Sequence, residues 1–238
     1  MARTLVSAPA PARGPAPARQ RAPQRLWRLP GVYAPQADTS LLARALHREG
    51  VSGLDVLDVG TGSGALALYA AHLGAHVTAL DVSRRAVWST RLNARRARQQ
   101  VTAVRGDLAK ALAHRRFDLV VSNPPYVPAP DPAPPARGAA RAWDAGRDGR
   151  LVLDRLCDAA PALLHPHGVM LLVHSALSGT DRTLTRLEKA GLRAQVADRA
   201  LVPYGPVLRG RLDWLRERGL IDPESAEEEL VVIRAERA

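Results

Sequence analysis

The chain has 238 residues, 46% of them hydrophobic, which is enough to bury the core of one domain. Aromatic residues make up only 4%, so we expect a core of Leu, Val and Ala, as in a Val-rich parallel sheet covered by helices. The formal net charge is +11, and nearly all the cations are Arg. Residues 1–28 hold six arginines and no acid, and subtracting them from +11 leaves +5 for the rest. A moderate charge of this size does not by itself predict nucleic-acid binding.

Several structural classes are excluded by what the composition lacks. Cys157 is the single cysteine, so no disulfide can form within the chain, and its apolar helical surroundings favour a core residue over a nucleophile. The seven histidines show no ligand spacing with Cys or acids, and we assign no metal. No apolar run approaches the roughly 18 residues of a membrane span, and the start of the chain lacks a secretory signal pattern. We therefore expect a cytoplasmic protein without a membrane segment.

Residues 1–25 are rich in Pro, Ala and Arg and cannot bury enough apolar surface to fold, so we expect disorder there and a single domain over 26–238. Asp38-Thr39-Ser40 carries helix-start chemistry. Further on, strand and helix patterns alternate. Predicted strands cover 54–59, 76–83, 101–107, 117–123, 168–175, 192–198 and 229–237, and predicted helices cover 65–73, 83–100, 150–164 and 180–190. The alternation predicts an α/β fold: a doubly wound, mainly parallel seven-stranded sheet with helices on both faces.

A glycine turn, DVGTGSG, follows the first predicted strand. Its glycines let the backbone approach a ligand closely. The spacing differs from the dinucleotide pattern G-x-G-x-x-G, and Asp58 stands two residues before the first glycine, where it would repel a pyrophosphate. An acid at this position suits a ligand that carries an ammonium and a sulfonium. The turn therefore indicates a cationic cofactor rather than NAD.

Two further acids end the next two predicted strands. Asp81 follows the second strand, where it is placed to accept both hydroxyls of a ribose. Asp107 follows the third strand, where it could accept from an adenine amino group. Each acid alone is more often a helix cap or a solvated charge. Acids after three consecutive strands, beside a glycine turn, are better explained by one nucleoside-binding site.

The fourth predicted strand runs straight into Asn123-Pro124-Pro125-Tyr126. The two prolines restrict the backbone and so fix where the Asn123 amide and the Pro124 carbonyl point. These two oxygens can hold a planar NH2 group in one orientation, with the ring of Tyr126 against its flat face. In a doubly wound sheet strands one and four are neighbours, so the glycine turn and the NPPY turn should face each other across one crevice. Positioning the nitrogen is then the main catalytic effect, and we predict no general base.

These motifs resemble the class I S-adenosylmethionine-dependent methyltransferases, and within them the HemK/PrmC-like (NPPY) family that methylates a glutamine side-chain amide of translation release factors. DVGTGSG resembles the cofactor loop of the family and SNPPYVP its catalytic signature. VYAPQADTSLL (32–42) and AWDAGRDGRLVLDR (142–155) resemble segments of its short branch, which lacks the N-terminal helical domain. The resemblance covers about residues 30–238 and implies a Rossmann-like methyltransferase fold with S-adenosyl-L-methionine as cofactor. It also implies that Asn123, Pro124 and Tyr126 hold the target, and that the cofactor is contacted by Thr39, Asp58, Gly60, Gly62, Asp81, Asp107, Leu108 and Asn123.

Departures from the family leave the methyl acceptor open. The Pro/Arg-rich start and the long stretch 203–229 before the last strand are not family features. NPPY suits any planar NH2, so an exocyclic amine of RNA or DNA, a lysine or a small molecule remain alternatives, as does a non-catalytic S-adenosylmethionine-binding protein. A protein substrate is favoured over nucleic acid, and a general RNA-binding module is disfavoured because residues that could stack on bases are few. Short-branch relatives in eukaryotes work with a small zinc-binding subunit, and the sequence leaves such a partner open.

Overall fold

The computed structural model of the protein describes residues 26–108, 112, 115–133, 135 and 138–237. The segment 1–25, for which we expect disorder, lies outside these residues. Among the described residues no helix is both long and apolar enough to cross a membrane.

The described residues form one seven-stranded sheet, as predicted, with the strand order β3-β2-β1-β4-β5-β7-β6. The pairs on the β3 side are parallel, and β7 runs antiparallel to both of its neighbours. The order reverses between β1 and β4, which pair directly, and this is the position where ligands bind in doubly wound sheets. The strands are β1 (Asp55–Val59), β2 (His76–Asp81), β3 (Val101–Arg105), β4 (Phe117–Ser122), β5 (Leu164–Ser175), β6 (Leu192–Pro203) and β7 (Glu227–Arg237).

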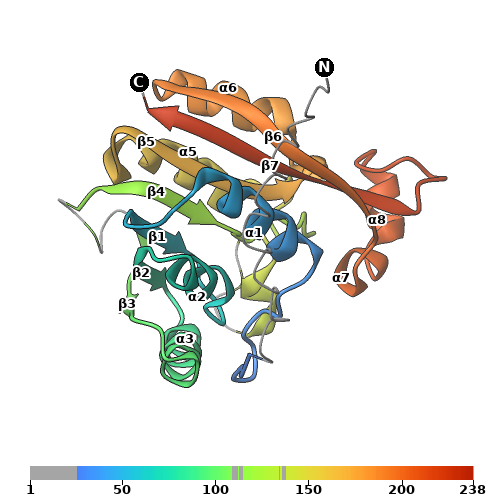
Figure 1. Cartoon of the computed structure of the whole chain (residues 1–238). Coiled ribbons are helices and arrows are strands. Elements are labelled where there is room, and N and C mark those ends of the chain that lie inside the picture. The colour runs from blue at the N-terminus through green and yellow to red at the C-terminus, as the bar shows by residue number, and fades with distance from the viewer. Residues whose placement is uncertain (1–25, 109–111, 113–114, 134, 136–137, 238) are drawn as a thin grey trace, which may run out of the picture.

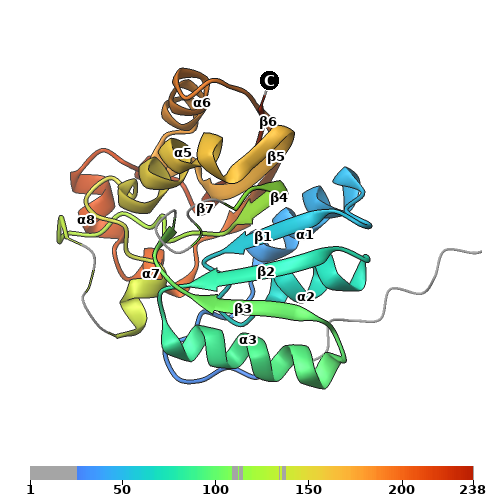
Figure 2. The same cartoon turned by 90° about the vertical axis from the view of Figure 1, so that its left-hand side faces the viewer.

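Helices cover the two faces of the sheet (Figures 1 and 2). On one face α1, α2 and α3 contact one another in turn, and on the other α5 packs beside α6. The apolar residues of α1 recur at helical spacing, so that one face of the helix is buried on the sheet. The helices are α1 (Ala37–Glu49), α2 (Ala65–His72), α3 (Arg84–Ala97), α5 (Leu151–Leu163), α6 (Thr180–Lys189), α7 (Pro206–Arg209) and α8 (Leu212–Glu217), with 3-10 turns η1 (Ala139–Ala142) and η2 (Ala176–Ser178).

The core is built from aliphatic side chains, as the composition predicts. Strand β4 is the most deeply buried of the central strands, and Phe117, Leu119, Val120 and Val121 are each at most 1% exposed. Cys157 is also fully buried, and burial raises the pKa of its thiol to about 12, so it remains protonated as a small core residue. This packing fixes the ends of β1 and β4, and with them the two turns that follow.

Two segments differ from the sequence-based expectation. The stretch 203–229 contains the short helices α7 and α8, which its irregular pattern does not predict. Helix α1 begins at Ala37, so Asp38 lies within its first turn and not at a capping position. Its carboxylate accepts from Thr39 in the same turn and from Tyr33 and Tyr126 of other segments, as described below.

Candidate active site

A pocket of about 540 Å³ opens at the carboxyl ends of β1, β2 and β4. One side is formed by the glycine turn and by the acids at the carboxyl-terminal ends of β1, β2 and β3, and the other side by the NPPY turn. Segments distant in the sequence, namely 31–39, 141–144, 202–208 and 228–230, complete the wall. All the residues that the sequence analysis nominates line this pocket: Thr39, Asp58, Gly60, Gly62, Asp81, Asp107, Leu108, Asn123, Pro124 and Tyr126.

The glycine turn adopts backbone conformations that favour glycine. Gly60 has φ 72° and Gly62 has φ 56°, both in the left-handed region. The N–H of Gly60 donates to the carbonyl of Leu80 (2.8 Å), which ties the turn to β2. A Cβ at Gly60 would stand 3.9 Å from the main-chain oxygen of Asn123. The glycine turn and the NPPY turn are therefore neighbours, as the strand order requires.

Asp58 stabilises the glycine turn through hydrogen bonds. Its side chain is 1% exposed, and its Oδ2 accepts hydrogen bonds from Thr61 Oγ1 (2.7 Å) and from the N–H of Ala67 (3.1 Å). Burial raises the pKa of Asp58 to about 7, against the lowering effect of these two donors. The carboxylate thus holds the turn against the start of α2, in addition to lining the pocket.

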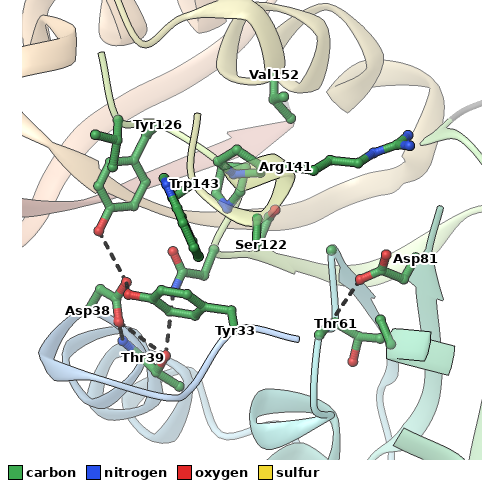
Figure 3. Close-up of a pocket in the computed structure, with 18 of the residues that line it drawn as sticks. Tyr33, Asp38, Thr39, Thr61, Asp81, Ser122, Tyr126, Arg141, Trp143 and Val152 are labelled. Atoms are coloured by element: carbon green, nitrogen blue, oxygen red, sulfur yellow. Dashed lines mark hydrogen bonds between the residues drawn. The ribbon is translucent and has the colours of Figure 1, made fainter. Parts of the chain in front are cut away.

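Asp81 ends β2 with both carboxylate oxygens facing backbone donors. Oδ2 accepts from the N–H of Gly62 (3.0 Å), and Oδ1 accepts from the N–H of Ser83 (2.8 Å). Burial raises the pKa of Asp81, while the backbone donors and the nearby charge of Arg141 lower it. Each oxygen retains a second lone pair, which is the acceptor capacity that two ribose hydroxyls require. Figure 3 shows Asp81 beside Thr61 on the glycine-turn side of the pocket.

Asp107 and Leu108 form the far rim of the same side. Both carboxylate oxygens of Asp107 accept from Arg155 Nη2 (2.8 and 2.9 Å), and the side chains of this ion pair are about half exposed. Leu108 is buried, with φ 39°. Arg155 comes from α5, a connection that the sequence does not show. The assignment of Asp107 to an adenine amino group stays a prediction.

On the opposite side, Asn123 follows β4 directly. Its Nδ2 donates to Thr39 Oγ1 (3.4 Å), so Oδ1 points away from Thr39. Tyr126 is 8% exposed, and its hydroxyl donates to Asp38 Oδ2 (3.1 Å). Burial, and then the charge of Asp38, raises the pKa of the Tyr126 phenol well above its usual value, so it remains a donor.

Asp38 is the centre of a hydrogen-bond cluster that the sequence analysis missed. It is 2% exposed, and Oδ2 accepts from Tyr33 (2.9 Å) as well as from Tyr126. Oδ1 accepts from the N–H (2.6 Å) and the hydroxyl (3.2 Å) of Thr39. Figure 3 shows Tyr33 and Tyr126 converging on Asp38, with Thr39 beneath. One carboxylate therefore anchors both Tyr126 and the threonine that holds the Asn123 amide. The only signal in the sequence was its position in YAPQADT.

A second support for the NPPY turn comes from the segment 142–150. Val127 donates to the carbonyl of Trp143 (2.8 Å) and accepts from the N–H of Ala145 (3.0 Å). Gly149 has φ 71°, and a Cβ there would overlap the carbonyl oxygen of Tyr126. The Gly/Arg-rich sequence is thus needed for close packing behind the turn.

The stretch 203–229 adds a further wall. Pro206, Val207 and Leu208 of α7 line the pocket. Arg211 donates to the carbonyl of Pro128 (2.9 Å) and pairs with Asp144 (2.7 Å), which joins this wall to the NPPY side. Glu228, also missed by the sequence analysis, lines the same region; it is 8% exposed, and burial raises its pKa to about 7. The described residues bring together no cluster of His, Cys, Asp and Glu that could hold a metal ion.

Comparison with known proteins agrees with this geometry. Residues 24–132 match the family model of the methyltransferase small domain. The chain is 31% identical over 176 residues to a putative protein N5-glutamine methyltransferase of Methanocaldococcus jannaschii, a match covering 74% of this chain and 88% of that protein. It is 35% identical to methyltransferase HEMK2 of Mus musculus, with 70% and 82% covered. Among solved structures, the E. cuniculi Mtq2–Trm112 complex, which methylates the termination factor eRF1, has a TM-score of 0.61 at 27% identity and covers 87% of this chain and 99% of that one.

The fold and the site therefore define a methyltransferase of the Rossmann-like class. Within that class, the chain belongs to the HemK-like family of protein glutamine methyltransferases.

Proposed function

We propose that the protein transfers a methyl group from S-adenosyl-L-methionine to the side-chain amide nitrogen of a glutamine in a protein, and that this protein is a translation termination factor. The observation that carries the proposal is the closeness of the two turns: the main-chain oxygen of Asn123 lies 3.9 Å from the position of a Cβ on Gly60. A methyl donor held on the glycine turn and an amide held on NPPY would then share one pocket. The relatives named for glutamine and eRF1 methylation support this acceptor.

The residues present fit this cofactor. Asp81 retains acceptor capacity for two ribose hydroxyls, and the buried Asp58, whose raised pKa a cationic ligand would lower, lies beneath the turn. The glycines leave open the space that a side chain would fill. We assign cofactor contacts to Thr39, Asp58, Gly60, Gly62, Asp81, Asp107, Leu108 and Asn123, as the resemblance implies. When bound, S-adenosylmethionine supplies a methyl group that passes from sulfur to nitrogen, and the nitrogen gives up one proton.

The NPPY turn orients the acceptor. Asn123 Oδ1 and the Pro124 carbonyl would accept the two N–H groups of the glutamine amide, and Tyr126 limits the space beside its flat face. An amide nitrogen is a weak nucleophile because its lone pair is delocalised, so holding it in line supplies most of the rate enhancement. The two oxygens also favour the positive charge that develops on nitrogen. A termination factor as substrate supports a cytoplasmic location for the protein. Residues 26–238 would form one catalytic domain.

The test is transfer of radiolabelled methyl groups by the full chain. We offer three acceptors: a Gly-Gly-Gln peptide, a whole termination factor and adenine-containing RNA. Methyl groups should appear in the termination factor, and more weakly in the peptide. Methylation of RNA alone would refute the glutamine assignment while sparing the NPPY mechanism. Full binding of the cofactor with no transfer to any of the three would favour a small-molecule acceptor or a missing partner subunit.

Variants of Asn123 separate catalysis from cofactor binding. Asn123→Ala removes one of the two acceptors for the target, so kcat should fall by about 100-fold or more while cofactor affinity changes much less. Asn123→Asp keeps an acceptor and the shape, and should retain partial activity. Equal loss of cofactor affinity and of kcat in Asn123→Ala would show that the residue binds cofactor and does not orient the target.

A further inference from the structure

An exposed aromatic and basic surface, which shares no lining residue with the pocket, lies where residues 26–30 run along α3. It contains four of the six large hydrophobic side chains that the described residues expose: Trp27 (57%), Leu29, Trp88 (62%) and Leu92. Together with Arg28, Arg91 and Arg95 these side chains line a hollow of about 320 Å³. Figures 1 and 2 both place α3 at the opposite end of the molecule from α6. Large apolar side chains gathered in one exposed patch indicate a binding surface.

The surface is held in place by buried polar side chains. Asn93 accepts from the N–H of Trp27 (2.9 Å) and donates to its carbonyl (2.8 Å), and Ser89 Oγ accepts from the N–H of Leu29 (3.2 Å). Both Asn93 and Ser89 are at most 3% exposed. Arg96 lies over the indole of Trp27, 5.0 Å from the ring centre. The backbone of residues 26–30 is therefore fixed, while the side chains of Trp27 and Leu29 are exposed. Little conformational entropy is then lost when a ligand binds.

The charge of the surface is uniformly positive. Segments 26–37 and 82–106 contain eight arginines and no acid. Among the described residues, ion pairs hold many arginines elsewhere, such as Arg155 and Arg234, but none of the thirteen pairs involves an arginine of these two segments. This part of the molecule thus presents cations that the described residues do not neutralise.

The positive charge of this surface limits the kinds of ligand that can bind to it. A second copy of this surface would bring like charges together, and residues 1–25 carry five further arginines and no acid, so neither complements it. The occupant must be anionic and must offer flat apolar groups to the indoles. Guanidinium groups match phosphates with paired hydrogen bonds, and every nucleobase has a face that stacks on an aromatic ring. A basic array that runs along α3 suits an extended polyanion better than a compact acidic protein.

We propose that this surface binds single-stranded RNA, with bases stacked on Trp88 and Trp27 and phosphates held by the arginines of α3. Its lining residues differ from those of the methyl-transfer pocket, and the proposal does not depend on the identity of the methyl acceptor. The small number of aromatic residues argued against RNA binding in the sequence, but the fold brings two of the four tryptophans together, Trp88 on the basic helix α3 and Trp27 beside it.

The experiment measures fluorescence anisotropy of a labelled single-stranded oligouridylate of about 16 nucleotides with the full chain. Trp88→Ala should weaken binding by about tenfold or more, because stacking on one base is lost, and Trp88→Phe should restore most of it. Arg95→Glu should weaken binding and reduce the slope of log affinity against log salt, by about 0.7 for one lost phosphate contact. Lys189→Glu on α6 changes the net charge by the same amount and serves as the matched control.

Circular dichroism confirms that each variant is folded, which we expect because Trp88, Arg95 and Lys189 are all exposed. The proposal is overturned by RNA affinities in Trp88→Ala and Arg95→Glu that match the Lys189→Glu control. It is also overturned by polyglutamate binding as tight as RNA binding and equally weakened by Trp88→Ala, because that result assigns the surface to an acidic protein.

Discussion

Replacing Asp38 by Asn tests whether one buried carboxylate organises the acceptor side of the site. Asp38 accepts four hydrogen bonds, from Tyr33, Tyr126 and two groups of Thr39. An asparagine side chain has one oxygen and one NH2 group. Either the two tyrosine hydroxyls or the two donors of Thr39 must therefore face this NH2 group, which is itself a donor. The tyrosine hydroxyls can rotate to accept, but the main-chain N–H of Thr39 cannot. We therefore expect the tyrosine side of the cluster to rearrange.

The magnitude follows from the burial of this cluster. Hydrogen bonds to a charged group contribute about 1.5 to 3 kcal/mol each, and a buried unpaired donor costs a similar amount. With two of the four bonds weakened, and some relaxation of the hydroxyls, the free energy of unfolding should fall by about 3 kcal/mol. For a chain of this size that lowers Tm by about 6 to 12 °C. Since Thr39 holds Asn123 and Asp38 holds Tyr126, kcat should fall about 10- to 100-fold, more than any change in KM.

The assay combines thermal unfolding with steady-state methyl transfer to a termination factor. Gln36→Ala is the matched control, because Gln36 donates to the exposed side of the Tyr33 hydroxyl (2.9 Å) and leaves the bonds to Asp38 intact. Its Tm and kcat should stay close to those of the wild type. A folded Asp38→Asn protein with wild-type kcat would refute the positioning role. A loss of kcat in Gln36→Ala as large as in Asp38→Asn would show that general loosening of the segment is responsible.

Three further variants address the cofactor side and the support of the NPPY turn. Asp81→Ala should weaken S-adenosylmethionine binding by about 1.5 to 3 kcal/mol in calorimetry, since charge-assisted bonds to ribose are lost, and unchanged affinity contradicts the assignment. Asp58→Asn should flatten the pH dependence of unfolding. The folded wild type keeps a proton that the unfolded chain loses near pH 4, so its stability falls, by up to about 4 kcal/mol, as pH rises to about 7. If the free energy of unfolding, measured with urea, varies with pH in the same way in both proteins, the role assigned to Asp58 is wrong. Gly149→Ala should displace Tyr126 and lower kcat with little effect on cofactor affinity, whereas Gly219→Ala, with a similar φ but nothing within 4 Å of the added Cβ, should leave kcat unchanged.

The fold could be predicted from the sequence because its parallel strands are buried and its helices are amphipathic. Runs such as FDLVVS in β4 and the 3.6-residue pattern of α1 report burial directly. The stretch 203–229 could not be predicted in this way. Its two helices are only 4 and 6 residues long, too short for a periodic pattern to emerge. They are fixed by tertiary contacts instead, such as the bonds of Arg211 to Pro128 and Asp144.

The candidate site could be predicted from the sequence only where its residues stand at the ends of recognisable strands. Gly60 and Asn123 directly follow β1 and β4, and Asp81 is the last residue of β2, so the strand order brings them to one edge. Asp38 and Glu228 lie 190 residues apart in the sequence yet line the same pocket, and no local pattern connects them. A buried carboxylate is recognised by its partners, and those are known only once the chain is folded.

The two sides of the pocket therefore differ in how far their sequences can change without loss of cofactor binding. Most of the cofactor side is built by one continuous unit, from the end of β1 through α2 to the end of β2, where Asp58 accepts from the main chain of Ala67 and Asp81 from that of Gly62. A substitution in this unit disturbs the conformation of the glycine turn as well as the binding of the cofactor. The acceptor side is assembled from segments distant in the sequence, which meet through hydrogen bonds of Asp38 and of Val127, and its wall at α7 is joined to the rest by Arg211. Because α7 shares no hydrogen-bonded strand with the glycine turn, its sequence can change the shape offered to the methyl acceptor while cofactor binding is preserved.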